Sequence, residues 1–131
     1  MPRPEFIYKI LPHSSVDSRF TFPIPIPASH QFFLSPLDMQ DGFVHFSTGK
    51  QIPGTLNRFF QDVPAVTLLR CETDRLASWK RLSWDTNEGE EYPHLHAQLE
   101  GENIDSFKDV HREGKSWDTV LEGLQKSGWL A

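Results

Sequence analysis

The stretch Asp41-Gly42-Phe43-Val44-His45-Phe46-Ser47-Thr48 places one histidine and two hydroxyl groups inside a run of apolar, strand-forming residues. Successive side chains of a β-strand point to opposite faces of its sheet. The alternation therefore predicts that Phe43, His45 and Ser47 share one face of a strand. His45 and Ser47 should lie side by side on that face, and this strand is where we expect chemistry.

A second run with the same alternation follows later in the chain, as Pro93-His94-Leu95-His96-Ala97-Gln98-Leu99. A strand over these residues places His94, His96 and Gln98 on one face. We expect the polar faces of the two strands to line one cleft.

The rest of the chain predicts further strands and helices around these two runs. Strands are expected over residues 6–10, 63–71 and 82–84. Helices are expected after Ser35 as N-cap with Asp38 in a capping box, from residue 48 or 49 to 60, and over 116–128. A turn or a single helical turn is expected over residues 73–79, and an acidic turn over 85–91. The pattern over residues 104–110 does not distinguish a helix from a strand. This order predicts an α+β fold, a split mixed or antiparallel sheet flanked by helices.

The chain of 131 residues has the length of a single compact domain, 1–131. Residues 12–33 interrupt it with Phe-Pro-Ile-Pro-Ile-Pro-Ala, whose prolines lack the N–H groups that a central strand must donate. We expect an extended surface loop there. Its four phenylalanines, Phe20, Phe22, Phe32 and Phe33, suggest a lid over an apolar pocket.

Composition and charge exclude several classes of protein. The mean hydropathy of -0.48 and the lack of a long apolar run predict no membrane span, and residues 1–5 show no secretory signal. A net charge of -5 argues against nucleic acid as a partner, although Arg70, Arg75, Lys80 and Arg81 form a local basic group. The lone Cys71 suits a reducing compartment, so we expect a cytoplasmic protein.

Several ordered motifs between Phe6 and Leu99 together resemble the family named domain of unknown function 952. They are Ile7-Tyr8-Lys9-Ile10, Ser35-Pro36-Leu37-Asp38, Asp41 to Thr48, Gln51, Thr55, Phe59-Phe60, Leu82-Ser83-Trp84-Asp85 and Tyr92-Pro93-His94-Leu95-His96. The resemblance implies a fold similar to the ADP-ribosyltransferase superfamily, in which a His-x-Ser or His-x-Thr strand holds the ribose of NAD. His45 and Ser47 match that pattern, which makes an NAD-like nucleotide the implied cofactor.

The chain also departs from the pattern that the resemblance implies. Asp85 stands where glutamate is expected, and His96 stands where relatives often have an aromatic residue. The superfamily's acidic residue on the last strand has only Glu100 as a candidate here. The resemblance therefore supports the fold more strongly than it supports NAD cleavage.

Structural roles remain as alternatives for the residues singled out. His45 also fits a core histidine, Ser47 and Thr48 fit helix caps, and Asp41-Gly42 fits a turn. His94 and His96 fit ordinary edge-strand positions, Trp84 fits the core, and Gln51 fits a solvated side chain. A metal site of His45, His94 and His96 with Glu72 or Asp85 is a further alternative, although no metal ligand is assigned.

We interpret the chain as a small protein with a polar His/Ser-lined cleft for a nucleotide-like or other small polar metabolite. His45 and His94 are the catalytic candidates for a glycosidic, ADP-ribosyl-type transferase or hydrolase. We expect His45 and Ser47 to hydrogen-bond a ribose-like diol, and His94 to serve as a second polar contact or as general acid or base. The substrate-binding candidates are Ser47, Thr48, Gln51, Trp84 and His96. The alternatives are a non-catalytic metabolite-binding or accessory protein and a metal-dependent enzyme.

Overall fold

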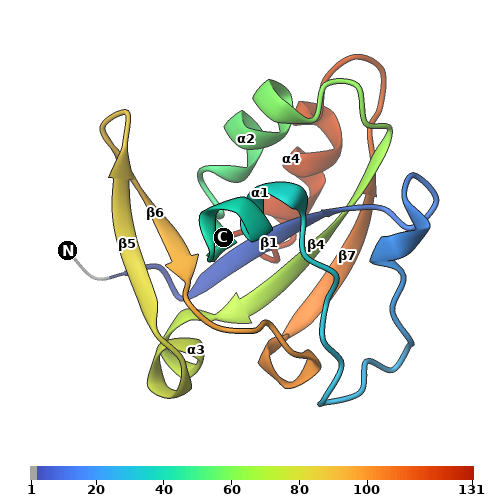
Figure 1. The fold of residues 1–131 in the computed structure, drawn as a ribbon. Coiled ribbons are helices and arrows are strands. Elements are labelled where there is room, and N and C mark those ends of the chain that lie inside the picture. Colours follow the sequence, from blue (N-terminus) through green and yellow to red (C-terminus); the bar gives the residue numbers. More distant parts are fainter. Residues whose placement is uncertain (1–2) are drawn as a thin grey trace.

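The computed structural model describes residues 3–131 as one mixed α+β domain with two antiparallel sheets (Figure 1). Met1 and Pro2, part of the start in which no secretory signal is expected, lie outside the described residues. The larger sheet has the strand order β3-β1-β4-β7. Its strands are β1 (Phe6–Pro12), β3 (Ser47–Thr48), β4 (Ala65–Glu72) and β7 (Ser106–His111).

The smaller sheet has three strands in the order β2-β6-β5. They are β2 (Val44–His45), β6 (Glu90–Leu95) and β5 (Leu82–Asn87). In this sheet His45 lies opposite His94, and His94 lies opposite Ser83. The two histidine runs are therefore neighbouring strands of one sheet, and β6 is its central strand rather than an edge.

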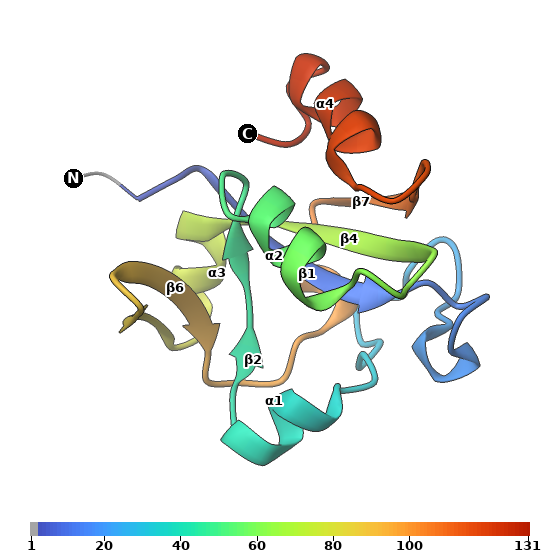
Figure 2. The same ribbon diagram turned by 90° about the horizontal axis from the view of Figure 1, so that it is seen from above.

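Four α-helices and two short 3-10 helices complete the fold. They are α1 (Pro36–Asp41), α2 (Ile52–Phe59), α3 (Thr73–Trp79), α4 (Asp118–Lys126), η1 (Ser18–Phe20) and η2 (Gly101–Asn103). Figure 2 shows α4 and α1 on opposite sides of β1 and β4 of the larger sheet. None of the helices within residues 3–131 is long and apolar enough to cross a membrane.

The larger sheet is covered by apolar residues on both faces, because β1 and β4 alternate between two cores. On one face, α2 and α4 supply Ile52, Leu56 and Leu121, and Trp117, which precedes α4, is only 1% exposed. On the other face, the core joins the larger sheet to β2, β6, α3 and the loop 12–33. The smaller sheet thus turns one face towards the core and leaves the other for polar residues.

The expected strand over Phe43 to Thr48 is divided in the structure. Val44 and His45 pair with β6, whereas Ser47 and Thr48 pair with β1 of the larger sheet. Phe46 between them is 2% exposed, and its N–H donates to the carbonyl of Pro93 at 3.0 Å. The expectation of one regular strand was therefore wrong, because the chain passes from one sheet to the other at a buried aromatic residue.

Three element boundaries also differ from the expectation. The acidic residues 85–91 are not all a turn but half of the β-hairpin of β5 and β6, because within 85–91 only Glu88 and Gly89, with φ of 52° and 84°, form the turn. The second histidine strand ends at Leu95, and α2 begins at Ile52 rather than at residue 48 or 49. Phe59, expected on the apolar face of α2, is 69% exposed.

The loop 12–33 packs three of its four phenylalanines against the core, whereas Phe33 is 38% exposed. Phe20 and Phe32 are each 5% exposed in the core between the two sheets. Phe22 meets Phe107 edge to face at a centroid distance of 5.1 Å. Aromatic packing of this kind ties the loop to β7, and the loop is part of the folded body.

Candidate functional site

His45 lies where α1 meets β2, and two carboxylates of α1 hold its ring. Nδ1 of His45 is 2.6 Å from Oδ1 of Asp38, and Nε2 is 3.0 Å from Oδ2 of Asp41. An ionised carboxylate only accepts hydrogen bonds, and a neutral imidazole has a single N–H. Both contacts are therefore satisfied together when the ring carries a proton on each nitrogen. Such a ring has one proton available on its more exposed side, beside Asp41.

Asp38 is buried and paired with Lys9 of β1. The Lys9 Nζ lies 2.6 Å from Oδ2 of Asp38, and the two side chains are 8% and 1% exposed. Burial acts to raise the pKa of Asp38, but hydrogen bonds from His45 and the charge of Lys9 outweigh it and lower that pKa. Burial also lowers the pKa of Lys9, and Asp38 opposes that shift. Asp38 is therefore an anion that orients the ring of His45.

The local sequence explains why α1 presents both carboxylates to β2. The Ser35 side chain accepts the backbone N–H of Asp38, and Pro36 follows at the start of the helix, as expected. Gly42 ends the helix at φ 77°, in the left-handed region that suits glycine. Asp38 and Asp41 are three residues apart and so share one side of the helix. The Asp38 side chain contacts Lys9 and His45 instead of closing a capping box.

His94 lies opposite His45 on β6 and has a carboxylate of its own. Its Nδ1 is 2.7 Å from Oδ2 of Asp85 on β5, and its side chain is 13% exposed. The hydrogen bond from Ser83, followed by that from His94, lowers the pKa of Asp85. Two imidazoles, each fixed by its own carboxylate, therefore face one another at a centroid distance of 5.2 Å.

Phe43 forms the apolar part of this surface. Its ring stacks on His94 at a centroid distance of 4.2 Å and lies 4.7 Å from His45 and 5.4 Å from His96. On the opposite face, Val44 and Leu95 are 3% and 0% exposed in the core. The histidines therefore occupy the outward face of the smaller sheet, which we call the histidine face, defined by Phe43, His45, Ser83, Asp85, His94 and His96.

A hollow of about 410 Å³ adjoins the histidine face. It is lined by Leu34, Asp38, Met39, Gly42, Phe43, Val44, His96, Ala97 and Gln98. Three of these residues, Asp38, Phe43 and His96, belong to the histidine face or bind it directly. Of the three imidazoles only that of His96 lines the hollow, and Asp38 in its lining binds the ring of His45.

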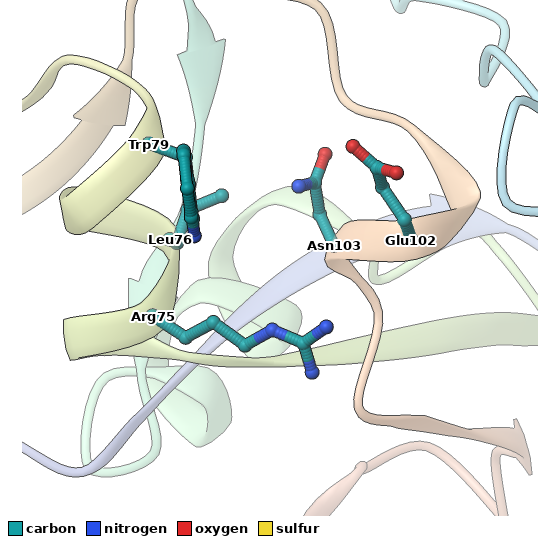
Figure 3. Close-up of a pocket in the computed structure, with 5 residues that line it drawn as sticks. All are labelled: Arg75, Leu76, Trp79, Glu102 and Asn103. Carbon is teal, nitrogen blue, oxygen red and sulfur yellow. The ribbon is translucent and has the colours of Figure 1, made fainter.

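A second hollow, of about 350 Å³, lies between α3 and η2. Figure 3 shows Arg75, Leu76 and Trp79 of α3 facing Glu102 and Asn103 of η2 across it. It contains none of the histidines and none of the residues predicted to act on a substrate. We therefore place the candidate site at the histidine face.

Three of the predicted binding residues lie where the chain leaves β2. Ser47 is 7% exposed and pairs with Tyr8 of β1, so it belongs to the other sheet from His45. Thr48 Oγ1 accepts the N–H of Gln51 at 3.3 Å. The Gln51 side chain accepts the N–H of Thr48 and donates to the carbonyl of Glu91 at 2.7 Å. The structure thus shows Thr48 and Gln51 fastening the start of α2 to the hairpin.

The other two predicted binding residues lie on opposite faces of the smaller sheet. Trp84 packs against the core while the guanidinium of Arg3 lies 4.5 Å above its ring. His96 follows β6 and joins the histidine face, with Nε2 2.7 Å from Oγ of Ser83. The structure therefore brings together His45, His94 and His96, and it places Ser47 and Trp84 elsewhere.

Sequence reasoning missed the groups that hold the imidazoles. Lys9 and Asp38 are 29 residues apart in sequence, and no local pattern joins them. The sequence did contain a sign that Ser83 and Asp85 lie together, because positions i and i+2 of a strand share a face. Two strands around a turn at Glu88 and Gly89 place that face against His94.

The expected metal alternative has no matching arrangement in the described part of the chain. Within residues 3–131, no group of three or more His, Cys, Asp and Glu side chains is placed to hold a metal ion. Asp85 binds His94 and Ser83. Glu72 pairs with Phe6 at the end of β4.

Comparisons with known proteins agree with this fold. The family described as "Protein of unknown function (DUF952)" matches residues 26–107, which is more than half of the chain. A crystal structure of protein CC0527 from Caulobacter crescentus is 26% identical, with a TM-score of 0.69 over 89% of this chain and 98% of that one. A solution NMR structure of CC0527 is 27% identical, with a TM-score of 0.67 over 94% and 97%. No curated protein matches this sequence.

Proposed function

From the premise that this chain belongs to the DUF952 family, we propose that its histidine face binds a nucleotide-like or other small polar metabolite and acts on it by general acid–base chemistry. The first reaction to test is an ADP-ribosyl-type transfer or hydrolysis at a glycosidic carbon. We propose a reducing, cytoplasmic setting, which suits the buried thiol of Cys71.

The observation that carries this proposal is the facing pair of imidazoles, each bound to a different carboxylate. His45 contacts Asp38 and Asp41, His94 contacts Asp85, and the ring centroids are 5.2 Å apart. A histidine oriented by a carboxylate is the usual arrangement for a general acid or base, because the partner fixes the ring and its tautomer. Two such histidines that face one another provide both a proton donor and a proton acceptor.

The two histidines take different roles because their carboxylates differ. In hydrolysis, a new C–O bond forms to water as the glycosidic bond breaks, and the broken bond's electron pair leaves with the departing group. His94 receives the proton of the attacking water, and His45 gives a proton to the departing group from its more exposed nitrogen. In transfer, a hydroxyl of the acceptor molecule replaces the water.

The ligand class follows from the surroundings of the imidazoles. Phe43 offers an aromatic ring edge beside His45, His94 and His96. The adjoining hollow is lined by both apolar side chains and polar groups such as Asp38 and Gln98. A planar base with an attached diol or ribose has both properties, so an NAD-like nucleotide is the first compound to offer the site.

The experiment is a thermal-shift titration with NAD, ADP-ribose, nicotinamide and a nucleotide panel. A ligand at 100 times its Kd stabilises the native state by about 2.7 kcal/mol, which raises the melting temperature. We expect a shift for one of these compounds with the wild type, and its loss in His94→Ala. The matched control is His111→Ala, because His111 lies on β7 of the other sheet. A shift that survives His94→Ala, or no shift with any compound, would overturn the proposal.

Turnover separates catalysis from the second candidate, a non-catalytic metabolite-binding protein. This alternative is favoured by the lining of the hollow, which includes His96 but neither of the catalytic candidates His45 and His94. If His94 is the general base, His94→Ala lowers kcat by about 10²- to 10⁴-fold. Tight binding of a panel compound without product formation would select the binding protein.

A further inference from the structure

One chain of hydrogen bonds links His96, Ser83, Asp85 and His94 across the histidine face. His96 Nε2 lies 2.7 Å from Ser83 Oγ. Ser83 Oγ lies 2.7 Å from Asp85 Oδ2, and that same oxygen lies 2.7 Å from His94 Nδ1. Asp85 Oδ2 thus accepts hydrogen bonds both from Ser83 and from His94.

The antiparallel register builds this chain. Ser83 lies directly opposite His94, and Asp85 and His96 each lie two residues along from that pair, on the same face. Diagonal neighbours of this kind are within reach of long polar side chains. The Glu88-Gly89 turn connects the two strands whose register brings Ser83, Asp85 and His94 together, and His96 directly follows the second strand.

The direction of each hydrogen bond follows from the acceptor-only character of the carboxylate. An ionised Asp85 cannot donate, so the single hydroxyl proton of Ser83 points to Asp85. Ser83 must then accept from His96, which requires a proton on Nε2 of His96. For the same reason, Nδ1 of His94 must carry a proton. Hydrogen bonds from Ser83 and His94 lower the pKa of Asp85, which keeps it ionised at neutral pH.

We infer that Ser83, Asp85 and His96 act as positioning residues that fix the proton of neutral His94 on Nδ1 and leave Nε2 as the proton acceptor. His94 of β6 and His96, which follows β6, are therefore opposite tautomers, with Nδ1–H on His94 and Nε2–H on His96. Asp85 is the residue that decides the tautomer of His94. Ser83 donates its only hydroxyl proton to Asp85 and therefore accepts a hydrogen bond from Nε2 of His96.

The other groups around His94 are compatible with this assignment. Phe43 stacks on the ring face, and His45 of β2 meets it at a centroid distance of 5.2 Å. Asp38 and Asp41 of α1 bind the two nitrogens of His45. These carboxylates are engaged by His45, so Asp85 is the carboxylate in contact with His94.

The catalytic use of this proton placement rests on the proposed function, in which Nε2 of His94 accepts a proton from water or from an acceptor hydroxyl. The placement of the protons itself needs no ligand. It can therefore be read directly from the resting protein by nuclear magnetic resonance.

The experiment is a long-range proton–nitrogen correlation spectrum of the histidine rings, recorded at a pH at which the rings are neutral. In the wild type, we expect the resonances of a protonated Nδ1 and an unprotonated Nε2 for His94, and the reverse pattern for His96. A wild-type His94 with its proton on Nε2 would overturn the inference.

Two variants test the direction of the chain. Asp85→Ala removes the acceptor, and the Nδ1–H tautomer of His94 should give way to Nε2–H. Ser83→Ala leaves Asp85 in place, so His94 should stay Nδ1–H while His96 loses its fixed tautomer. The matched control is Asp109→Ala, since Asp109 lies 3.6 Å from Nε2 of His13 on the other sheet. An Asp85→Ala spectrum in which His94 remains Nδ1–H would overturn the role of Asp85.

The outcomes separate this inference from the proposed function. A His94 tautomer as inferred, together with no ligand shift for any panel compound, would remove the function and leave the proton placement. A ligand shift that depends on His94, together with the opposite tautomer, would keep the site and remove the positioning role of Ser83, Asp85 and His96.

Discussion

Nζ of Lys9 lies 2.6 Å from Oδ2 of Asp38, and both side chains are at least nine-tenths buried between the larger sheet and α1. Lys9 also donates to the carbonyl of His45 at 3.1 Å. One buried cation therefore holds both the carboxylate and the backbone that position the catalytic candidate. The Lys9–Asp38 ion pair is buried, whereas the side chain of His45, which Asp38 holds, is 27% exposed.

Removing the charge of Asp38 should destabilise the protein strongly. Breaking a buried ion pair at one partner costs about 3–5 kcal/mol, because the other charge stays buried without compensation. We expect Asp38→Asn to lower the free energy of unfolding by that amount in urea denaturation. The double variant Lys9→Met/Asp38→Asn should recover part of the loss. A double variant no more stable than Asp38→Asn would contradict the coupling.

The contribution of Asp38 to stability should fade in acid. Burial alone would raise its pKa, but the hydrogen bonds from His45 and the charge of Lys9 lower that pKa below the usual range of an aspartate. A carboxyl whose folded pKa is lowered stabilises the fold fully above its unfolded pKa, and this stabilisation is lost as the pH falls through the folded pKa. The difference in unfolding free energy between wild type and Asp38→Asn should therefore be constant above about pH 5 and shrink as the pH falls from there towards about pH 3. A difference that stays constant over this range would be inconsistent with an ionised Asp38.

Cys71 should be unreactive in the native protein. Burial, with a smaller contribution from the charge of Asp105, raises the pKa of its thiol to about 12, and the side chain is 0% exposed. Only the thiolate attacks a disulfide reagent. We expect no modification at about pH 8 until denaturant unfolds the chain, when the single thiol should react fully. Rapid modification without denaturant would show that β4 opens in the native state.

The loop 12–33 should contribute to stability rather than to ligand access. Phe32 is 5% exposed in the core between the sheets, and truncation of a buried phenylalanine costs about 3–5 kcal/mol. We expect Phe32→Ala to lower the free energy of unfolding by this amount and to leave the affinity for a bound nucleotide unchanged. Ile24→Ala is a suitable control, because Ile24 is 73% exposed. A weakened affinity in Phe32→Ala at full folding would support the lid that the sequence suggests.

Local chemistry explains which elements were predictable. The N-cap Ser35 with Pro36 marked the start of α1, and the apolar spacing of Trp117 and Leu121 marked α4, because these signals act within one or two helical turns. The α+β class with antiparallel sheets follows from the order of such elements and is confirmed. The family resemblance is also confirmed by the match over residues 26–107.

Contacts between distant residues explain what was missed. The passage of the chain between sheets at Phe46 depends on its hydrogen bond to Pro93, which no pattern near Phe46 reveals. The roles of Lys9 and Asp38 depend on a contact across 29 positions. The acidic composition of residues 85–91 concealed a hairpin that only the Glu88-Gly89 turn identifies. The histidines could therefore be chosen from the sequence, but the contact of Lys9 with Asp38, which holds His45, could not.

The most direct measurement is a titration of the wild type with NAD, ADP-ribose and the nucleotide panel, followed through the ring resonances of its six histidines. We expect one compound to shift the resonances of His45 and His94 in a saturable way while His13 and His111, on the larger sheet's side, stay in place. Saturable shifts confined to His13, His30 and His111, or no shift with any compound, would contradict a ligand site at the histidine face.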